Sequence, residues 1–285
     1  MRVAIPGAAG RMGCTLVREV AADDNLKLVG AIEAAASLSL GKDAGAVAGI
    51  ENKGVPIVGS LAEGLANAEG VIDFTVPSVT VELAGLCAER GTAMVIGTTG
   101  LSAAEAEQIE QAAKRIPIVW APNMSVGINV LIQLVQNAAR LLGADYDLEI
   151  VEAHHKHKKD APSGTALRLA EALAEATSER GTLAERACYG RQGQSEGRPK
   201  DEIGIHTVRG GDVVGDHTVY YCTDGERLEL THRASSRQTF AKGAVRALHW
   251  LNDREAGLYD MQHVLGLKEA KATLVTPRVS PDGLS

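Results

Sequence analysis

The sequence is poor in aromatic residues, which make up 3% of its 285 positions, and it carries a formal net charge of −7. A nucleic-acid surface combines basic stripes with stacking rings, so both features argue against such a partner. No apolar run approaches the ~20 residues that a membrane-spanning helix needs. The N-terminal apolar stretch stops at Gly7, too early for a signal peptide. We therefore expect a cytoplasmic protein that contacts neither nucleic acid nor membrane.

Cysteine is scarce as well, and the four cysteines include no C-x-x-C pair. This spacing is typical neither of a zinc knuckle nor of a disulfide framework, so we expect reduced thiols. The rest of the composition, 45% hydrophobic and 23% charged, is that of a globular protein. A chain of 285 residues exceeds the usual size of one domain, which predicts two. The cysteines are Cys14, Cys87, Cys188 and Cys222.

The first part of the chain alternates short β-branched runs with helical patterns. Strands are predicted at residues 2–5, 26–32, 70–75, 93–99 and 116–123, and helices at 11–24 and 101–115. This alternation indicates βαβ units in a mostly parallel sheet, the α/β class with a Rossmann-like dinucleotide-binding domain.

After Asn123 the pattern changes. A long apolar helix is predicted at 125–143, a strand at 146–155, and a helix at 163–177 with Ser163 as its N-cap. Residues 181–201 predict an exposed loop. Residues 203–234 predict antiparallel strands that turn at Gly210-Gly211 and Asp224-Gly225, before a helix at 239–253.

The first strand runs into the glycine turn "PGAAGRMG". Glycine there permits a tight turn and lets a pyrophosphate approach the amides at the N-terminus of the next helix. Glu33 lies 20 residues after Gly13, where its carboxylate could accept hydrogen bonds from the adenosine ribose. Arg11 could meet a 2′-phosphate, which Glu33 would repel. The turn therefore predicts NAD or NADP as ligand, bound by Gly7, Ala8, Ala9, Gly10, Arg11, Met12 and Glu33.

Two later loops follow predicted strands, and ligands of open α/β sheets lie beyond the carboxyl ends of the strands. We expect both loops to line the nicotinamide side of the cofactor. They contain Gly97, Thr98 and Thr99 in "GTTG", and Ala121, Pro122, Asn123 and Met124 in "APNM".

The stretch "EAHHKHKKDAPSGTAL", residues 152–167, admits three interpretations. A metal site is disfavoured because adjacent strand residues such as His154 and His155 point to opposite faces, and because lysines surround them. A polyanion patch is disfavoured because the basic run is short, flanked by acids and free of aromatic residues. The third interpretation is an acid catalyst beside a small carboxylate.

The residues after the proline support that third interpretation. Ser163, Gly164 and Thr165 begin a helix, so amide N–H groups and two hydroxyls are available to one anion. His155 and the neighbouring lysines would add positive charge, and a histidine or lysine in such a place can donate a proton. The other five histidines are predicted to be structural or surface residues: His206, His217, His232, His249 and His263.

Several segments resemble the family of 4-hydroxy-tetrahydrodipicolinate reductase, also called dihydrodipicolinate reductase, of bacterial diaminopimelate and lysine biosynthesis. The resemblance extends from Met1 to about Leu267. It rests on "VAIPGAAGRMG", "VIDFT", "VIGTTG", "EAHHKHKKDAPSGTAL", "TVRGGDVVGDHTV" and "THRASSRQTFAKGAVRAL", which occur in family order.

The resemblance implies a Rossmann-like domain of residues 1–124 that is completed by about 235–267. It further implies a central α+β domain with a mixed sheet, residues 125–234, which binds substrate and usually builds a homotetramer. Residues 268–285 lie outside the resemblance, and because they carry two prolines and no periodic pattern we expect a loose tail. The implied reaction is NAD(P)H-dependent reduction of a small cyclic hydroxy-dicarboxylate with loss of water, without a metal.

The resemblance also implies roles for individual residues. His154 corresponds to a proton donor or acceptor and Lys158 to a proton donor, whereas His155, Gly164 and Thr165 correspond to substrate ligands. Hydride addition to a conjugated ring imine leaves an enamine that must take up a proton, so an acid is needed within hydrogen-bond reach.

One position departs from the family pattern. Many members carry arginine after the ribose-binding acid, where it can meet the 2′-phosphate of NADPH, and here the residue is Ala34. We therefore predict that NADH works at least as well as NADPH. Three other functions would fit parts of the pattern: a reductase of another imine or semialdehyde, a non-catalytic dinucleotide sensor, and a metal-dependent hydrolase.

Overall fold

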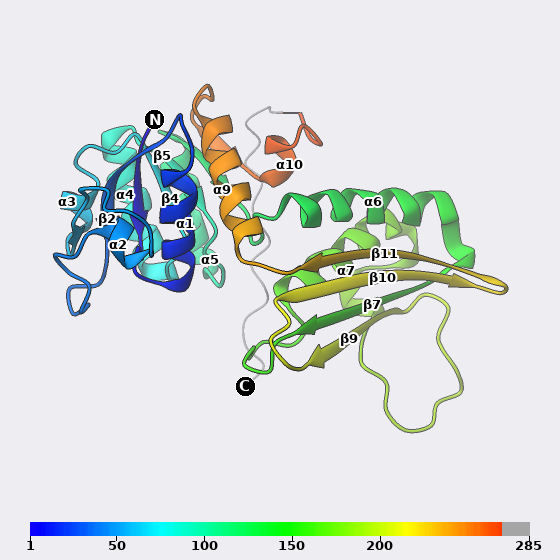
Figure 1. The fold of residues 1–285 in the computed structure, drawn as a ribbon. Coiled ribbons are helices and arrows are strands. Elements are labelled where there is room, and N and C mark those ends of the chain that lie inside the picture. The colour runs from blue at the N-terminus through cyan, green and yellow to red at the C-terminus, as the bar shows by residue number, and fades with distance from the viewer. Residues whose placement is uncertain (270–285) are drawn as a thin grey trace. The chain divides into compact units, whose positions relative to one another are not determined.

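The computed structural model describes residues 1–269, and these form two compact units (Figure 1). Unit 1 comprises Met1–Val126 and the segment that begins at Arg237, and unit 2 comprises Gly127–Ser236. The tail predicted at 268–285 lies outside the described residues from position 270 onward.

Unit 1 is built on a seven-stranded sheet in which every strand pair is parallel, in agreement with the predicted mostly parallel sheet. The strands Ile57–Val58 and Gly257–Tyr259 were not predicted. The strand order is β12-β6-β5-β4-β1-β2-β3. The strands are β1 Arg2–Pro6, β2 Lys27–Ile32, β3 Ile57–Val58, β4 Gly70–Asp73, β5 Ala93–Ile96, β6 Pro117–Trp120 and β12 Gly257–Tyr259. The helices are α1 Arg11–Ala21, α2 Ala44–Val47, α3 Leu61–Gly64, α4 Pro77–Arg90, α5 Ala103–Ala113, α9 Gln238–Leu251 and α10 Met261–Val264.

Both faces of this sheet are covered by helices. Side chains of β1 alternate between two cores: Val3 and Ile5 join the core that α1 and α9 cover, whereas Ala4 joins the core that α4 and α5 cover. Such alternation follows from the two-residue period of a strand. The segment after unit 2 thus returns to complete the first unit, with α9 packed against α1.

Unit 2 has a mixed five-stranded sheet in the order β11-β10-β7-β9-β8. Its central strand β7 buries every second residue, and the buried set, Leu148, Ile150, Glu152 and His154, faces the helices. The phenol of Tyr221 donates to the Val135 carbonyl of α6 at 2.7 Å. The strands are β7 Asp147–His154, β8 Ala187–Tyr189, β9 Ile203–Arg209, β10 Gly215–Thr223 and β11 Glu226–Ala234; the helices are α6 Val126–Leu142, α7 Gly164–Ala176 and α8 Leu183–Arg186, with 3-10 turns at Gly143–Asp145 and Ser178–Arg180.

Two predictions for unit 2 need correction. The turn at Gly210-Gly211 does not join antiparallel neighbours, because β7 lies between β9 and β10 and pairs parallel with β9. The turn at Asp224-Gly225 is confirmed, with β10 and β11 antiparallel and Gly225 at φ +87°. Local turn chemistry cannot distinguish a hairpin from a crossover past a third strand.

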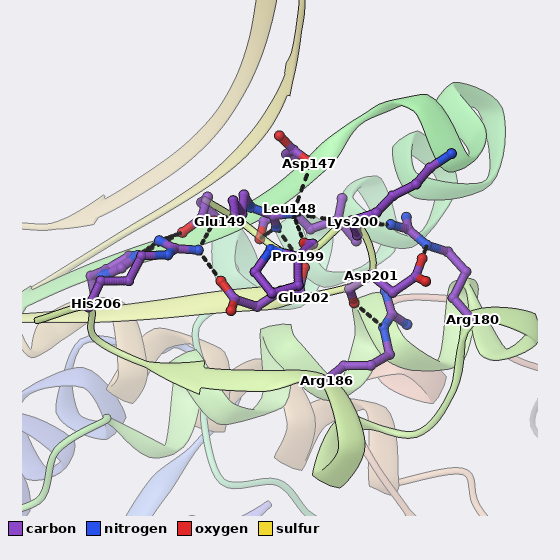
Figure 2. Close-up of polar contacts among 12 residues, drawn as sticks. Asp147, Leu148, Glu149, Arg180, Arg186, Pro199, Lys200, Asp201, Glu202 and His206 are labelled. Atoms are coloured by element: carbon purple, nitrogen blue, oxygen red, sulfur yellow. Dashed lines mark hydrogen bonds and ion pairs between the residues drawn. The ribbon is translucent and has the colours of Figure 1, made fainter. Parts of the chain in front are cut away.

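The predicted loop at 181–201 is also partly wrong, since it contains α8 and β8. These elements are too short to show a periodicity. The rest of the loop is fixed by charge: Arg198 Nε donates to Glu149 Oε1 at 2.7 Å, and Arg191 Nη1 donates to Glu149 Oε2 at 2.9 Å. Figure 2 shows this network on β7, where Glu149 and Asp147 face the loop residues up to Glu202. Within residues 1–269, no helix is both long and apolar enough to cross a membrane.

Candidate active site

The glycine turn after β1 is shaped for a close approach of backbone and ligand. Gly7 has φ +66°, a conformation that favours glycine. At Gly13, an added Cβ would lie 1.9 Å from the Gly7 carbonyl oxygen, so only glycine lets α1 pack against the turn. The N-cap of α1 is Gly10, and no side chain caps the first-turn amides. This helix N-terminus therefore presents its amides and its positive dipole end to an anion.

A cleft of about 930 Å³ opens at this turn, at the carboxyl edge of the sheet. Glu33 is held beside it, because its Oε1 accepts from the Ala9 amide at 2.9 Å and its Oε2 from the Ala34 amide at 3.3 Å. The size, the uncapped helix and the acid after β2 all fit a dinucleotide. The lining includes Gly7, Gly10, Arg11, Met12, Glu33, Ala34, Ser60, Thr75, Val76 and Arg237.

The structure divides the predicted cofactor residues into two groups. Gly7, Gly10, Arg11, Met12 and Glu33 line the cleft, whereas Ala8 and Ala9 do not. The loops after β5 and β6 lie at the same edge of the sheet but do not line this cleft; of their seven predicted residues, Thr98, Ala121 and Met124 are buried and Gly97, Thr99, Pro122 and Asn123 are more exposed.

The histidine site of unit 2 begins with a pair on one face of β7. Glu152 and His154 are two residues apart, so their side chains point the same way, and Nδ1 of His154 lies 2.5 Å from Oε2 of Glu152. Arg209, at the end of β9, donates to both carboxylate oxygens at 2.8 Å. The Ser163 amide donates to Oε1 at 3.1 Å. Glu152 is therefore a fully paired carboxylate that orients His154.

These contacts set the protonation of the pair. Burial alone would raise the pKa of Glu152, but the bonds from Arg209 and His154 outweigh it and hold that pKa at about 2. Burial lowers the pKa of His154, and Glu152 offsets only part of this because Arg209 already balances its charge. Near neutral pH His154 is thus neutral, with Nδ1–H donated to Glu152 and Nε2 left as an acceptor.

A second histidine packs against the first. The ring of His217, on β10, lies edge-on to His154 with 5.1 Å between centroids, and its Nε2 is 3.0 Å from the Ser163 hydroxyl. Burial lowers the pKa of His217 to about 3, so it is neutral. On the far side, an added Cβ at Gly215 would come within 3.1 Å of His154 Nε2, so glycine keeps that nitrogen accessible.

The predicted substrate ligands surround the start of α7. Ser163 is its N-cap, as predicted, and its hydroxyl oxygen accepts from the Ala166 amide at 3.1 Å. Gly164 is exposed, and a Cβ there would meet nothing within 4 Å. Nδ1 of His155 is buried and has no hydrogen-bond partner among the described residues. Together with Thr165 in the first turn, these groups can receive a carboxylate.

Lys158 lies close to His154. Its Nζ contacts both oxygens of Asp160 at 2.8 Å, and its charge is near enough to contribute to the low pKa of His154. The site thus offers a cationic donor beside a neutral imidazole acceptor. Residues 1–269 contain no group of three or more His, Cys, Asp or Glu side chains arranged to hold a metal ion.

Three residues of this site were missed at the sequence level. Glu152 could have been found, because the two-residue period of a strand places it on the face of His154. Arg209 had no local signal, since it reaches Glu152 from a strand more than fifty residues away. His217 was predicted to be a structural or surface residue, and its contact with His154 depends on the pairing of β10 with β7.

Known proteins of one family are similar to this chain over nearly its whole length. Residues 1–124 match the family described as "Dihydrodipicolinate reductase, N-terminus", and residues 127–265 match "Dihydrodipicolinate reductase, C-terminus". A 4-hydroxy-tetrahydrodipicolinate reductase of Anaeromyxobacter dehalogenans is 52% identical over 270 residues, covering 95% of this chain and 99% of the relative. One of Pseudomonas fluorescens is 54% identical over 268 residues, covering 94% and 99%.

A solved structure is also similar. The dipicolinate-bound dihydrodipicolinate reductase from Paenisporosarcina sp. TG-14 aligns with a TM-score of 0.71 and 25% identity, covering 91% of this chain and 97% of that one.

Proposed function

This chain belongs to the dihydrodipicolinate reductase family and is an oxidoreductase, and we propose which of its residues perform the reaction. It reduces (2S,4S)-4-hydroxy-2,3,4,5-tetrahydrodipicolinate to (S)-2,3,4,5-tetrahydrodipicolinate, a step of lysine biosynthesis through diaminopimelate. One hydride and one proton are added to the ring, and one water leaves.

A nicotinamide cofactor, when bound, supplies the hydride. In our proposal the pyrophosphate is received by the turn from Gly7 to Met12 and the N-terminus of α1, and Glu33 accepts from the adenosine ribose. The uncapped helix end and the cleft support this assignment. Gly97, Thr98, Thr99 and the segment from Ala121 to Met124 are assigned to the nicotinamide side by their place at the carboxyl edge.

The proton is assigned to Lys158, with His154 as its partner. A lysine is cationic at neutral pH and can donate, whereas a neutral His154 with Nε2 as acceptor is suited to receive and pass on a proton. Glu152 is proposed as the group that fixes the tautomer and the ring of His154, supported by the 2.5 Å contact. No metal is needed for this step.

The carboxylates of the substrate are assigned to the start of α7. Gly164 and Thr165 offer first-turn amides, and His155 offers a buried ring nitrogen that has no partner in the described structure. Two anchored carboxylates would fix the ring relative to His154 and Lys158, which reduces the orientational cost of the reaction.

Cofactor choice, assembly and location belong to the same proposal. Ala34 and Glu33 both line the cleft, an acid beside a small side chain, which favours NADH over a 2′-phosphate. A homotetramer is supported by the second face of the unit 2 sheet, where Val151 and Ala153 are only partly buried and Val208 is exposed. Light scattering on the intact protein tests that assembly. A cytoplasmic location is supported by four free cysteines.

The observation that carries the residue assignment is the Arg209–Glu152–His154 chain next to Lys158. A dihydrodipicolinate synthase reaction coupled to this enzyme, followed by NADH absorbance, tests it. We expect turnover by the wild type and a fall in kcat of about 10²–10⁴-fold in both His154→Ala and Lys158→Ala. Absent turnover in the wild type would overturn the reductase function; full activity in both variants would overturn only the proton assignment.

A further inference from the structure

A carboxylate is buried behind the dinucleotide cleft of unit 1 without a cation. Asp73, the last residue of β4, is fully buried, and within the described part of the chain it forms no ion pair. Burial raises its pKa, and its hydrogen bonds offset only part of the rise. Burying such a group is costly unless its bonds serve the fold or the site.

The donors to Asp73 are neutral and come from three segments. Thr75, in the loop after β4, gives its amide at 2.9 Å and its hydroxyl at 2.6 Å to Oδ1. Thr80 of α4 gives its hydroxyl to Oδ2 at 2.5 Å, and Thr98, in the loop after β5, gives its hydroxyl to the same oxygen at 3.1 Å. The Thr80 and Thr98 hydroxyl oxygens are 2.8 Å apart, which closes a ring of three oxygens.

Two of these three threonines, Thr75 and Thr98, belong to loops of the proposed dinucleotide site. Thr75 lines the cleft, and its Cγ2 lies 3.3 Å from where a Cβ of Gly7 would stand, so its methyl group packs on the glycine turn. Thr98 belongs to the "GTTG" loop, and its carbonyl accepts from the Trp120 indole at 3.4 Å, at the end of β6. Because Thr98 is only 3% exposed, its hydroxyl serves Asp73 and not the cleft.

We propose that Asp73 is a positioning residue for the dinucleotide, which holds the loops after β4 and β5 in place through Thr75 and Thr98. The inference rests on the proposed nicotinamide site and adds to it a residue that does not line the cleft. Its effect is preorganisation: loops that are already fixed lose less conformational freedom when the cofactor binds.

The matched variants are two buried threonines at opposite ends of β5. Thr98→Val removes the hydroxyl that Asp73 holds at the carboxyl end, and Thr98→Ser restores it. Thr92→Val removes a hydroxyl that donates to the Ala68 carbonyl at 3.3 Å, at the end of β5 away from the cleft. Thr98→Val loses contacts to Asp73 and Thr80, and Thr92→Val loses a single bond to a carbonyl, so a purely structural role allows a larger loss of melting temperature in Thr98→Val but predicts wild-type affinity for NADH in both.

Calorimetric titration of the intact protein with NADH gives the decisive readout. We expect Thr98→Val and Asp73→Ala to raise the Kd for NADH about tenfold, with Thr98→Ser and Thr92→Val within about twofold of the wild type. Wild-type affinity in Thr98→Val, or an equal loss in Thr92→Val, would overturn the proposal. If Asp73→Ala does not fold, judged by circular dichroism, the threonine series alone decides. A wild type that does not bind NADH would instead reject the proposed function.

Discussion

The acids at the two sites are held in opposite ways. In unit 2, Glu152 contacts the guanidinium of Arg209 and Asp160 contacts the ammonium of Lys158. In the part of unit 1 that the structure describes, Asp73 and Glu33 form no ion pair and accept only from amides and hydroxyls. Unit 1, to which we assign the cofactor, thus holds loops with neutral donors, and unit 2, to which we assign the substrate, orients a histidine with paired charges.

The difference follows from what each site must bind. A dinucleotide brings its own negative charge, and in our proposal the turn after β1 meets it with backbone amides. Proton transfer instead requires one tautomer of His154 in one orientation, and a paired carboxylate fixes both without charging the imidazole.

The largest expected effect comes from removing the paired carboxylate of Glu152. Glu152→Gln removes the carboxylate that orients His154 and leaves Arg209 without its anion. We expect kcat to fall about 10²–10³-fold while the KM for NADH stays within about twofold, because the variant affects proton transfer and not the cofactor. Steady-state kinetics with each substrate varied in turn measure both.

Glu149→Gln is the matched control for that variant. Glu149 lies on the same strand, three residues before Glu152, but it contacts Arg191 and Arg198 of the loop and His206 of β9. We expect a lower melting temperature with kcat almost unchanged. A kcat loss as large as that of Glu152→Gln would mean that the strand as a whole, and not the Glu152–His154 pair, carries the effect.

Glu152 and Asp73 should make stability depend on pH in opposite directions. The folded-state pKa of Glu152, about 2, lies below the ordinary value of 4.5, so its stabilisation is present above pH 4.5 and is lost as the pH falls toward 2. The pKa of Asp73 is raised, so the folded state gains relative stability as the pH falls through it. The free energy of unfolding of the wild type minus that of Glu152→Gln, measured with urea, should be smaller at pH 3 than at pH 6.

For Asp73→Asn, the free energy of unfolding of the wild type minus that of the variant should increase as the pH falls. The neutral amide lacks the penalty of the buried anion, so the wild type should improve relative to this variant as the pH falls. If the free energy of unfolding of the wild type minus that of the variant changed in the same direction for Glu152→Gln and for Asp73→Asn, the assignment of opposite pKa shifts would be contradicted.

The smallest expected effect concerns the second unpaired acid, Glu33. We expect kcat/KM with NADH to be at least as high as with NADPH, because Glu33 and Ala34 offer no cation to a 2′-phosphate. Ala34→Arg should raise kcat/KM with NADPH about tenfold and leave that with NADH nearly unchanged. A large NADPH preference in the wild type would contradict the prediction and point to Arg11 or Arg237 in the same cleft.

The sequence predicted those features that have a local period or a local motif. The parallel strands of unit 1, the glycine turn, the Ser163 cap and the "EAHHKHKK" strand end all depend on neighbouring residues, and the structure contains them. The order of β7, β9 and β10 was not predictable, because it depends on a crossover. Arg209 reaches Glu152 and His217 reaches His154 only through that order. The contacts of Asp73 depend on the meeting of the loop after β4, helix α4 and the loop after β5.

The central claim is that the two buried acids act on separable steps, Asp73 on cofactor binding and Glu152 on proton transfer. Its most direct test measures the Kd for NADH and kcat at saturating NADH in Thr98→Val and Glu152→Gln side by side. We predict a Kd raised about tenfold with kcat largely kept in the first, and kcat reduced at least a hundredfold with Kd kept in the second. The same parameter changing in both variants would contradict the claim.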